Sequence, residues 1–378
     1  MAQSVAILGT RGYPSYYGGF ETAVRKLAPY LADSGWDVTV YGRPDGVEVD
    51  DPDLDARVNR VITRGIESKA LSTLSYGFTA TVHAIRHRPD VVLIMNVANG
   101  YWLPLLKLFR IPTVINVDGM EWERAKWGRL AKFVFKTGAR LTALFGDDLI
   151  VDSTEIGRRW EAEFKRGGTH IPYGGDPISV LELEPGLTSR GYVLFVARFV
   201  PENSVDAFID AVELLDPAIP VVVVGSSGYG SHFEHRLLEL SQHRGGVHLL
   251  GHISDDPRLA SLWQHAGAYF HGHSVGGTNP ALVQAMASGA PVVARDTVYN
   301  REVLASGAVF VQPDPKEIAA ALERVMGDPE LQTALSTAGK DRATASYSWD
   351  PVCAAYEIVI HSQIRHAGQP PTFARSGK

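Results

Sequence analysis

Short, mostly apolar runs alternate with amphipathic segments along almost the whole chain. The apolar runs cover residues 5–9, 37–41, 90–95, 113–117, 148–152 and 169–172 in the first half, and 192–197, 221–225, 247–251, 268–270, 291–294 and 308–311 in the second. Runs that are apolar throughout are typical of parallel strands covered on both faces. The intervening segments, such as residues 20–31, place apolar side chains at helical spacing. This strand–helix alternation predicts an α/β protein with two doubly wound parallel sheets.

The alternation is interrupted by a polar, acidic stretch at residues 176–190 that contains two prolines and a glycine. We therefore expect a first domain at residues 1–178 and a second at 179–350. Residues 351–366 have apolar side chains at helical spacing and are expected to form a final helix, followed by a mobile polar tail at 367–378. Between two such domains, ligands bind in the loops that follow strands.

Composition narrows the class of protein. Of 378 residues, 45% are apolar and 21% charged, which is enough apolar material for two cores. The net charge of −6 argues against a nucleic-acid partner. The single cysteine, Cys353, excludes an intrachain disulfide and a cysteine-based zinc site, and favours a reducing compartment. With no apolar run of membrane-spanning length and no signal-peptide pattern at the start, we expect a cytoplasmic protein.

The segment after the first strand, residues 9–22, contains the adjacent glycines Gly18 and Gly19 just before a predicted helix. The spacing is not G-x-G-x-x-G, so the dinucleotide-binding fingerprint is absent. Adjacent glycines still let backbone N–H groups approach a ligand, and a helix N-terminus favours anions. We expect this loop to contact an anionic group such as a phosphate; a plain tight turn is the alternative.

A second glycine-rich loop, residues 271–280, follows the strand at 268–270. Asn279 suits the N-cap of the next helix and Pro280 its first position. The residues just before them offer backbone N–H groups and a hydroxyl, a suitable cradle for a diphosphate. The expected diphosphate-binding residues are Gly276, Gly277, Thr278 and Asn279.

Other polar side chains stand where strands of the second half end. Arg198 follows the strand at 192–197 and suits bidentate contact with a phosphate; an ion pair with a carboxylate such as Glu202 is the alternative. His271 and His273 flank a glycine, but no third metal ligand lies nearby. We therefore expect a structural or substrate-contacting role for these histidines, with His273 as the substrate contact, and no bound metal.

Three motifs together resemble glycosyltransferase family 4, and most of all its branch of rhamnosyltransferases of bacterial polysaccharide assembly. They are GGFET at 18–22, RFVPEN at 198–203 and HGHSVGGTNP at 271–280. The resemblance implies the GT-B fold, two Rossmann-like domains facing a cleft, with the final helix crossing back to the first domain. It also implies a retaining enzyme that uses a nucleoside-diphosphate-sugar donor. The favoured donor is dTDP-L-rhamnose, with UDP- and GDP-sugars as alternatives, and a lipid-linked saccharide is a candidate acceptor.

The chain departs from the family pattern at three positions. Most members have two glutamates, near the donor sugar and near the ribose, where this chain has Gly276 and Gln284, and a lysine where it has Asn203. Arg198 is therefore expected to be the main phosphate cation. A neutral amide binds a vicinal diol less well than a carboxylate, which favours a dTDP donor because it lacks the 2′-hydroxyl. The expected nucleoside-binding residues are Gln284, His252 and Ile253.

In the first domain, residues 116–122 follow the strand at 113–117 and are expected to face the cleft. By resemblance this is where the family places a residue near the donor sugar or the acceptor hydroxyl. Asp118 or Glu121 could accept a hydrogen bond from that hydroxyl, with a turn role as the alternative for Asp118. We take Asp118 and Arg198 as catalytic candidates, and Glu121, Trp122 and His273 as acceptor or sugar contacts.

The segment 124–140 is basic and contains no acidic residue. Its cations are Arg124, Lys126, Arg129, Lys132, Lys136 and Arg140. Interleaved apolar residues such as Leu130 and Phe133 make it an amphipathic helix that could lie on the anionic inner face of the cell membrane. A solvated helix face is the alternative.

The cluster at residues 51–55 has D-x-D spacing but lies in a proline-containing acidic loop. We interpret it as solvated surface, and expect an enzyme that needs neither metal nor other cofactor. Two alternatives to a glycosyltransferase stay open: a sugar-nucleotide epimerase with the same fold, and a non-catalytic sugar-nucleotide-binding protein. The sequence gives no indication of the oligomeric state.

Overall fold

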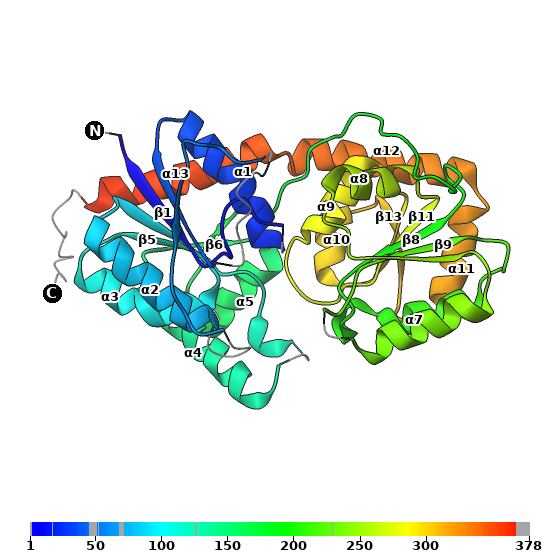
Figure 1. The fold of residues 1–378 in the computed structure, drawn as a ribbon, viewed down its shortest axis with the longest axis horizontal. Helices are drawn as coiled ribbons and strands as arrows, with labels where there is room; N and C mark the ends of the chain where they lie inside the picture. Colours follow the sequence, from blue (N-terminus) through cyan, green and yellow to red (C-terminus); the bar gives the residue numbers. More distant parts are fainter. Residues whose placement is uncertain are drawn as a thin grey trace, which may run out of the picture.

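The computed structural model describes residues 2–16, 18–44, 51, 53–67, 72–124, 127–228 and 230–367. Two α/β domains lie side by side (Figure 1). Each contains one sheet in which every strand pairs in parallel with its neighbours. The fold class predicted from the alternation of apolar runs is thus confirmed. The predicted mobile tail lies outside the described residues, apart from Ala367 at the end of the last helix.

The first domain has a seven-stranded sheet in the order β3-β2-β1-β4-β5-β6-β7. Its strands are β1 (Ser4–Leu8), β2 (Asp37–Gly42), β3 (Asn59–Ile62), β4 (Val91–Met95), β5 (Thr113–Asn116), β6 (Asp148–Val151) and β7 (Thr169–His170). Its helices are α1 (Gly19–Asp33), α2 (Ser72–His87), α3 (Leu103–Leu108), α4 (Arg129–Phe145) and α5 (Thr154–Phe164), with short 3-10 turns η1 (Val97–Trp102) and η2 (Glu121–Glu123). The sequence pattern missed β3, an edge strand in which no residue is fully buried.

The second domain has a six-stranded sheet in the order β10-β9-β8-β11-β12-β13. Its strands are β8 (Val193–Val196), β9 (Val221–Val224), β10 (Val247–Gly251), β11 (Ala268–His271), β12 (Val292–Arg295) and β13 (Ala308–Val311). Its helices are α6 (Val205–Leu214), α7 (His232–His243), α8 (Asp256–His265), α9 (Pro280–Ser288), α10 (Val298–Leu304), α11 (Pro315–Met326) and α12 (Pro329–Ser346), with the turn η3 (Pro201–Asn203). The chain passes between the two sheets through residues 171–192, which form neither helix nor strand.

Helices cover both faces of each sheet, so that each domain has two apolar layers. All five residues of β4 are buried, as expected of a central strand in such a sheet. The last helix, α13 (Trp349–Ala367), continues from α12 onto the first domain, where Trp349, Tyr356 and Ile360 join the core packed around α1 (Figure 1). The Asn116 side-chain amide at the end of β5 donates a 2.5 Å hydrogen bond to the Tyr356 hydroxyl, so α13 also supports a loop of the cleft.

Candidate active site

The two predicted glycine loops meet across the cleft. Gly18 is the N-cap of α1. A Cβ built on Gly19 would lie 3.0 Å from Cγ of Pro280 and 3.6 Å from Cζ of Tyr173. The beginning of α1 in the first domain therefore lies against the beginning of α9 in the second, and the fold brings together two loops that are about 260 positions apart in the sequence.

The loop at Gly276, Gly277 and Thr278 touches the first domain at two strand ends. The Thr278 hydroxyl donates a hydrogen bond to the backbone carbonyl of Asp152, directly after β6. A Cβ on Gly277 would overlap the Asp152 carboxylate, so only glycine fits there. After β5, a Cβ on Gly119 would lie 3.2 Å from Cα of Gly276. The domains are closed on each other at this loop.

The beginning of α9 has the predicted capping arrangement. The side-chain oxygen of Asn279 accepts hydrogen bonds from the backbone N–H groups of Ala281, at 3.0 Å, and Leu282, at 3.4 Å, and Pro280 follows as the first helical residue. The N-cap prediction is confirmed. Because this oxygen serves the helix itself, any contribution of Asn279 to a diphosphate would come from its backbone or its side-chain N–H group.

Two arginines, one from each domain, add to the effect of burial on the pKa of His273 through their positive charges. Burial, and then the charges of Arg198 and Arg124, lower the pKa of His273 to about 3. Arg198 is exposed at the end of β8, as predicted. Among the described residues its side chain forms no ion pair or hydrogen bond, so the alternative pairing with Glu202 is not found. Arg198 is therefore available to a ligand.

Asn203, which stands where the family has a lysine, is buried in η3. Its side-chain amide donates a 2.8 Å hydrogen bond to the backbone carbonyl of Arg198. Asn203 thus holds the chain at the end of β8 in place. Its burial also explains why an uncharged side chain suits this position.

Arg124 lies in the cleft, and this corrects the prediction that it belongs to a membrane-facing surface. It forms an ion pair with Glu121, and both side chains are largely buried. Burial opposes its charge, but Glu121, Asp118 and further carboxylates outweigh that effect and raise the pKa of Arg124. The site therefore contains a second guanidinium that the sequence had assigned elsewhere.

The acidic residues after β5 have separate roles. The Asp118 backbone is in the left-handed region at φ 55°, which is strained for a residue other than glycine, and its N–H donates a 3.0 Å hydrogen bond to the side chain of Asn116. Such strain is typical of functional sites. Glu121 pairs with Arg124 and accepts a 2.9 Å hydrogen bond from the Trp127 indole.

Trp122 does not face the cleft. It is 7% exposed and packs edge-on against Trp160 and Phe164, with ring centroids 6.4 and 5.7 Å away. The predicted acceptor contact is thus replaced by a role in the core, because its apolar ring is buried in the cluster that contains Ile156 and Trp160.

The histidine pair lies at the end of β11. The rings of His271 and His273 stack with centroids 4.3 Å apart, and Nδ1 of His271 lies 3.0 Å from the Tyr269 hydroxyl. Burial, and then His273, lower the pKa of His271 well below its usual value. Within the described part of the chain no group of three or more metal-ligating side chains occurs. His273 is half-buried at the cleft, whereas His271 belongs to the core.

The predicted nucleoside-binding residues all lie in the second domain. Gln284 is half-buried on α9, and His252 is exposed after β10. Ile253 is 8% exposed and packs in the core cluster that includes Leu282 and Val283 of α9. No described contact joins Gln284 to His252.

The D-x-D cluster is more structured than predicted. Asp51 is 8% exposed and accepts a 2.9 Å hydrogen bond from the Tyr16 hydroxyl, and Asp53 pairs with Arg25 at 3.2 Å. Reading it as solvated surface was wrong for Asp51. Asp53 thus helps to hold the buried Arg25 guanidinium, which sequence reasoning had not singled out.

The basic segment forms α4 but does not present one continuous basic face. Arg129 and Arg140 are exposed, whereas Lys136 pairs with Glu163 at 2.7 Å, and Lys126 lies outside the described residues. Three apolar side chains share the outward face: Leu130, Phe133 and Leu144, with exposed fractions of 77%, 63% and 73%. No described helix is long and apolar enough to cross a membrane.

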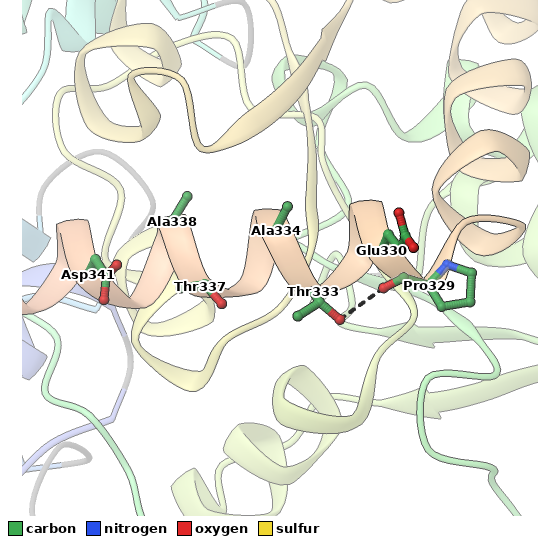
Figure 2. Close-up of a pocket in the computed structure, with 7 residues that line it drawn as sticks. All are labelled: Pro329, Glu330, Thr333, Ala334, Thr337, Ala338 and Asp341. Carbon is green, nitrogen blue, oxygen red and sulfur yellow. Dashed lines mark hydrogen bonds between the residues drawn. The ribbon is translucent and has the colours of Figure 1, made fainter.

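A groove elsewhere on the surface is unrelated to these loops. It follows the side of α12 and is lined by Pro329, Glu330, Thr333, Ala334, Thr337, Ala338 and Asp341 (Figure 2). All of these residues belong to one helix and none follows a strand, so the groove plays no part in the site described above.

Both halves of the chain match families of known proteins. Residues 18–170 match the family described as "Glycosyl transferase 4-like domain", and residues 185–342 match "Glycosyl transferases group 1". The phosphatidyl-myo-inositol mannosyltransferase of Mycolicibacterium smegmatis is 26% identical over 92% of both chains. A glycogen synthase of Mycobacterium tuberculosis is 25% identical over 94% of both.

Solved structures of glycosyltransferases share the fold. Sucrose-phosphate synthase from Thermosynechococcus elongatus superposes with a TM-score of 0.79 at 20% identity, over 97% of this chain and all of that one. Anabaena HepE in complex with UDP-glucose gives 0.73 at 15% identity, over 96% of this chain and all of that one. The chain is a glycosyltransferase with the GT-B fold, and its two domains are those of glycosyltransferase family 4.

Proposed function

We propose that this enzyme transfers a sugar, with dTDP-L-rhamnose as the favoured donor, to a saccharide acceptor with retention of anomeric configuration. The observation that carries the proposal is the meeting of two glycine loops, around Gly19 and Gly276 to Thr278, beside Arg198 and Arg124. Backbone N–H groups, a helix N-terminus and guanidinium groups are the means by which proteins bind a diphosphate.

Catalysis in such a site is chiefly positioning and electrostatic stabilisation. Arg198 would stabilise the negative charge that develops on the leaving diphosphate, and the loop at Gly276 and Gly277 would contribute backbone N–H groups. The acceptor hydroxyl would attack on the face from which the diphosphate leaves, and the departing phosphate oxygen would take its proton. Asp118, held at the cleft by Asn116, would orient that hydroxyl as a hydrogen-bond acceptor.

The base of the donor is proposed from Gln284. A neutral amide there suits a nucleotide without a 2′-hydroxyl, which supports a dTDP-sugar. The similar proteins support other donors as competitors: one is by name a mannosyltransferase, and HepE was solved with UDP-glucose. The rhamnosyl donor therefore has to be tested against GDP-mannose and UDP-glucose.

We further propose a lipid-linked acceptor reached at an anionic membrane surface. Exposed Leu130, Phe133 and Leu144 share the outer face of α4 with Arg129 and Arg140. Apolar side chains beside cations are typical of helices that lie in a membrane interface. The relative from Mycolicibacterium smegmatis has a lipid acceptor by its name, which supports the same placement.

A thermal-shift screen with dTDP, UDP and GDP, followed by turnover assays with dTDP-L-rhamnose, GDP-mannose and UDP-glucose, tests the function. We expect the largest shift with dTDP and transfer of rhamnose to a saccharide acceptor. Release of an epimerised donor would establish the epimerase instead, and binding without reaction the non-catalytic alternative. Transfer from GDP-mannose alone would overturn the proposed donor.

A further inference from the structure

Asp152 is a buried carboxyl group that neither the diphosphate site nor the core accounts for. It directly follows β6 and is 1% exposed. Its Oδ1 has no hydrogen-bond partner among the described residues. Because burying a polar atom without a partner is costly, such an atom in a folded protein calls for an explanation.

The backbone on either side of this carboxyl is held in place. The Asp152 carbonyl accepts the hydrogen bond from the Thr278 hydroxyl. The next residue, Ser153, is the N-cap of α5, and its hydroxyl accepts a 3.2 Å hydrogen bond from the N–H of Ile156. The position of the carboxyl is therefore set by both domains before any ligand binds.

The residues around the Asp152 carboxyl are the cleft residues Gly277, Asp118 and Arg124. Both carboxyl oxygens lie against Gly277. Burial, and then the charge of Asp118, raise the pKa of the Asp152 carboxyl well above its usual value, whereas the charge of Arg124 acts in the opposite direction. A Cβ built on the neighbouring Gly276 meets no atom within 4 Å, so the space beside the loop is open there. The Asp152 carboxyl thus borders the region between the predicted diphosphate cradle and Asp118.

The donor-side loop and helix have no acidic group of their own. Residues 257–295, which include the glycine loop and α9, contain neither Asp nor Glu. Sugar hydroxyl groups donate hydrogen bonds to the oxygens of a carboxyl group, whether it is ionised or neutral. An acidic group that contacts a donor sugar next to Gly276 would therefore come from another part of the chain, and Asp152 is a buried carboxyl group in contact with this loop.

We propose that the Asp152 carboxyl accepts a hydrogen bond from a hydroxyl group of the transferred sugar and thereby helps to determine which sugar is accepted. The proposal rests on the proposed function, because it assumes a nucleotide-sugar donor in this cleft. It assigns to Asp152 a contact with the sugar and none with the nucleoside or the phosphates.

Calorimetry with the full chain tests this contact. The probes are dTDP, dTDP-L-rhamnose and its 2-, 3- and 4-deoxy analogues, or the matching set for the base that the wild type prefers. Asp152→Ala is expected to bind the nucleotide sugar at least tenfold more weakly than the wild type and the diphosphate equally well. Asp152→Asn keeps a neutral hydrogen-bond acceptor, so its affinity for the nucleotide sugar should lie between those of the wild type and Asp152→Ala.

The deoxy analogues separate a sugar contact from a structural role. One deoxy analogue should bind to the wild type and to Asp152→Ala equally well. That analogue lacks the hydroxyl that Asp152 contacts, so removing the carboxyl group costs no further interaction. Asp148→Asn, at the other end of β6, is the matched control and should bind every probe as the wild type does. Asp148 begins β6, whereas Asp152 follows its end, and Asp148 accepts a 3.2 Å hydrogen bond from the side-chain amide of Gln363 in α13.

Two results would overturn the inference. If Asp152→Ala loses the diphosphate and the nucleotide sugar in parallel, Asp152 only supports the loop at Gly277. If it binds the nucleotide sugar as the wild type does, there is no contact. A wild type that binds no nucleoside diphosphate at all would instead overturn the proposed function, and this inference with it.

Discussion

The Arg25 guanidinium of α1 donates a 2.7 Å hydrogen bond to the Asp256 carboxylate of α8, and so joins the two domains by an ion pair. Arg25 is almost fully buried, and its other partners are Asp53 and the ring of Tyr16, 4.0 Å below the guanidinium. Because the pair spans the two domains, it supports the closed arrangement in which the glycine loops meet.

We expect Asp256→Asn to lower the free energy of unfolding by about 1–2 kcal/mol. This lies between the contribution of an exposed ion pair and that of a hydrogen bond to a buried charge, since Asp256 itself is half-exposed. Urea unfolding measures the change. The matched control is Asp33→Asn, which removes an exposed pair with Arg57 and should have little effect. Equal losses in both variants would contradict a special role for the domain-spanning pair.

Arg198→Ala should weaken binding of the preferred nucleoside diphosphate by about 1.5–3 kcal/mol, the range for a hydrogen bond to a charged group. The reason is that its exposed guanidinium stands at the end of β8 without a protein partner among the described residues. Calorimetry gives the affinity. Arg258→Ala, which removes an exposed partner of Glu184, controls for the loss of one positive charge. Unchanged affinity in a folded Arg198→Ala protein would exclude the phosphate contact.

Sugar transfer should proceed in excess EDTA. The sequence offers no cysteine-based site, and arginines, backbone N–H groups and a helix N-terminus can together stabilise a diphosphate without a metal ion. Initial rates with and without EDTA, Mg²⁺ and Mn²⁺ are the measurement. Activity lost in EDTA and restored by either ion would show that a metal takes part.

Acid should destabilise the folded protein partly through His273. Its folded-state pKa of about 3 lies below the ordinary value of 6.5, because burial and two arginines oppose a positive charge. As the pH falls below about 6.5, the unfolded chain therefore takes up a proton that the folded one does not. The resulting stability is complete above pH 6.5 and is lost progressively toward pH 3.

The pH slope of unfolding tests this linkage. Urea unfolding at several values between pH 7.5 and 4.5 should give a shallower slope for His273→Gln than for the wild type, because the variant has no imidazole to protonate in the unfolded state. Identical slopes would mean that His273 gains its proton equally in both states.

Replacing Arg129, Lys132 and Arg140 by Gln should reduce binding to anionic vesicles. Each cation near such a surface contributes up to about 1 kcal/mol, and this attraction weakens as salt shortens the Debye length. Co-sedimentation at low and high salt is the measurement, and the apparent KM for a lipid-linked acceptor should rise while the donor affinity is unchanged. Lys136 is left out because it already pairs with Glu163.

A control triple variant removes the same charge from the second domain, at Lys316, Arg324 and Lys340, which are exposed. It should sediment as the wild type does. If the wild type does not bind vesicles, or if both triple variants bind equally well, the outer face of α4 is a solvated surface.

The sequence by itself was sufficient to predict the architecture, because a parallel strand that is buried on both faces is a mostly apolar run of residues. The apolar runs that became β1, β4, β8 and β9 could be recognised without knowing their neighbours. β3 could not be recognised in this way, since it is an edge strand with no fully buried residue and is not an apolar run. The N-cap role of Asn279 could also be predicted, because an N-cap side chain bonds to the backbone of the next few residues in the sequence.

Only the tertiary structure decided which side chains share the cleft. Arg124 looked like part of a basic surface, but the fold pairs it with Glu121 and turns it toward Asp118. Trp122 follows a strand end, and its ring nevertheless packs inward. Asp152 is a charged residue at the end of an apolar run, which is the same pattern that identified Arg198 as a candidate. No pattern in the neighbouring sequence, however, indicated that Asp152 lies against Gly277. Periodicity records the burial of a segment, whereas the site depends on contacts between two domains, which no single segment encodes.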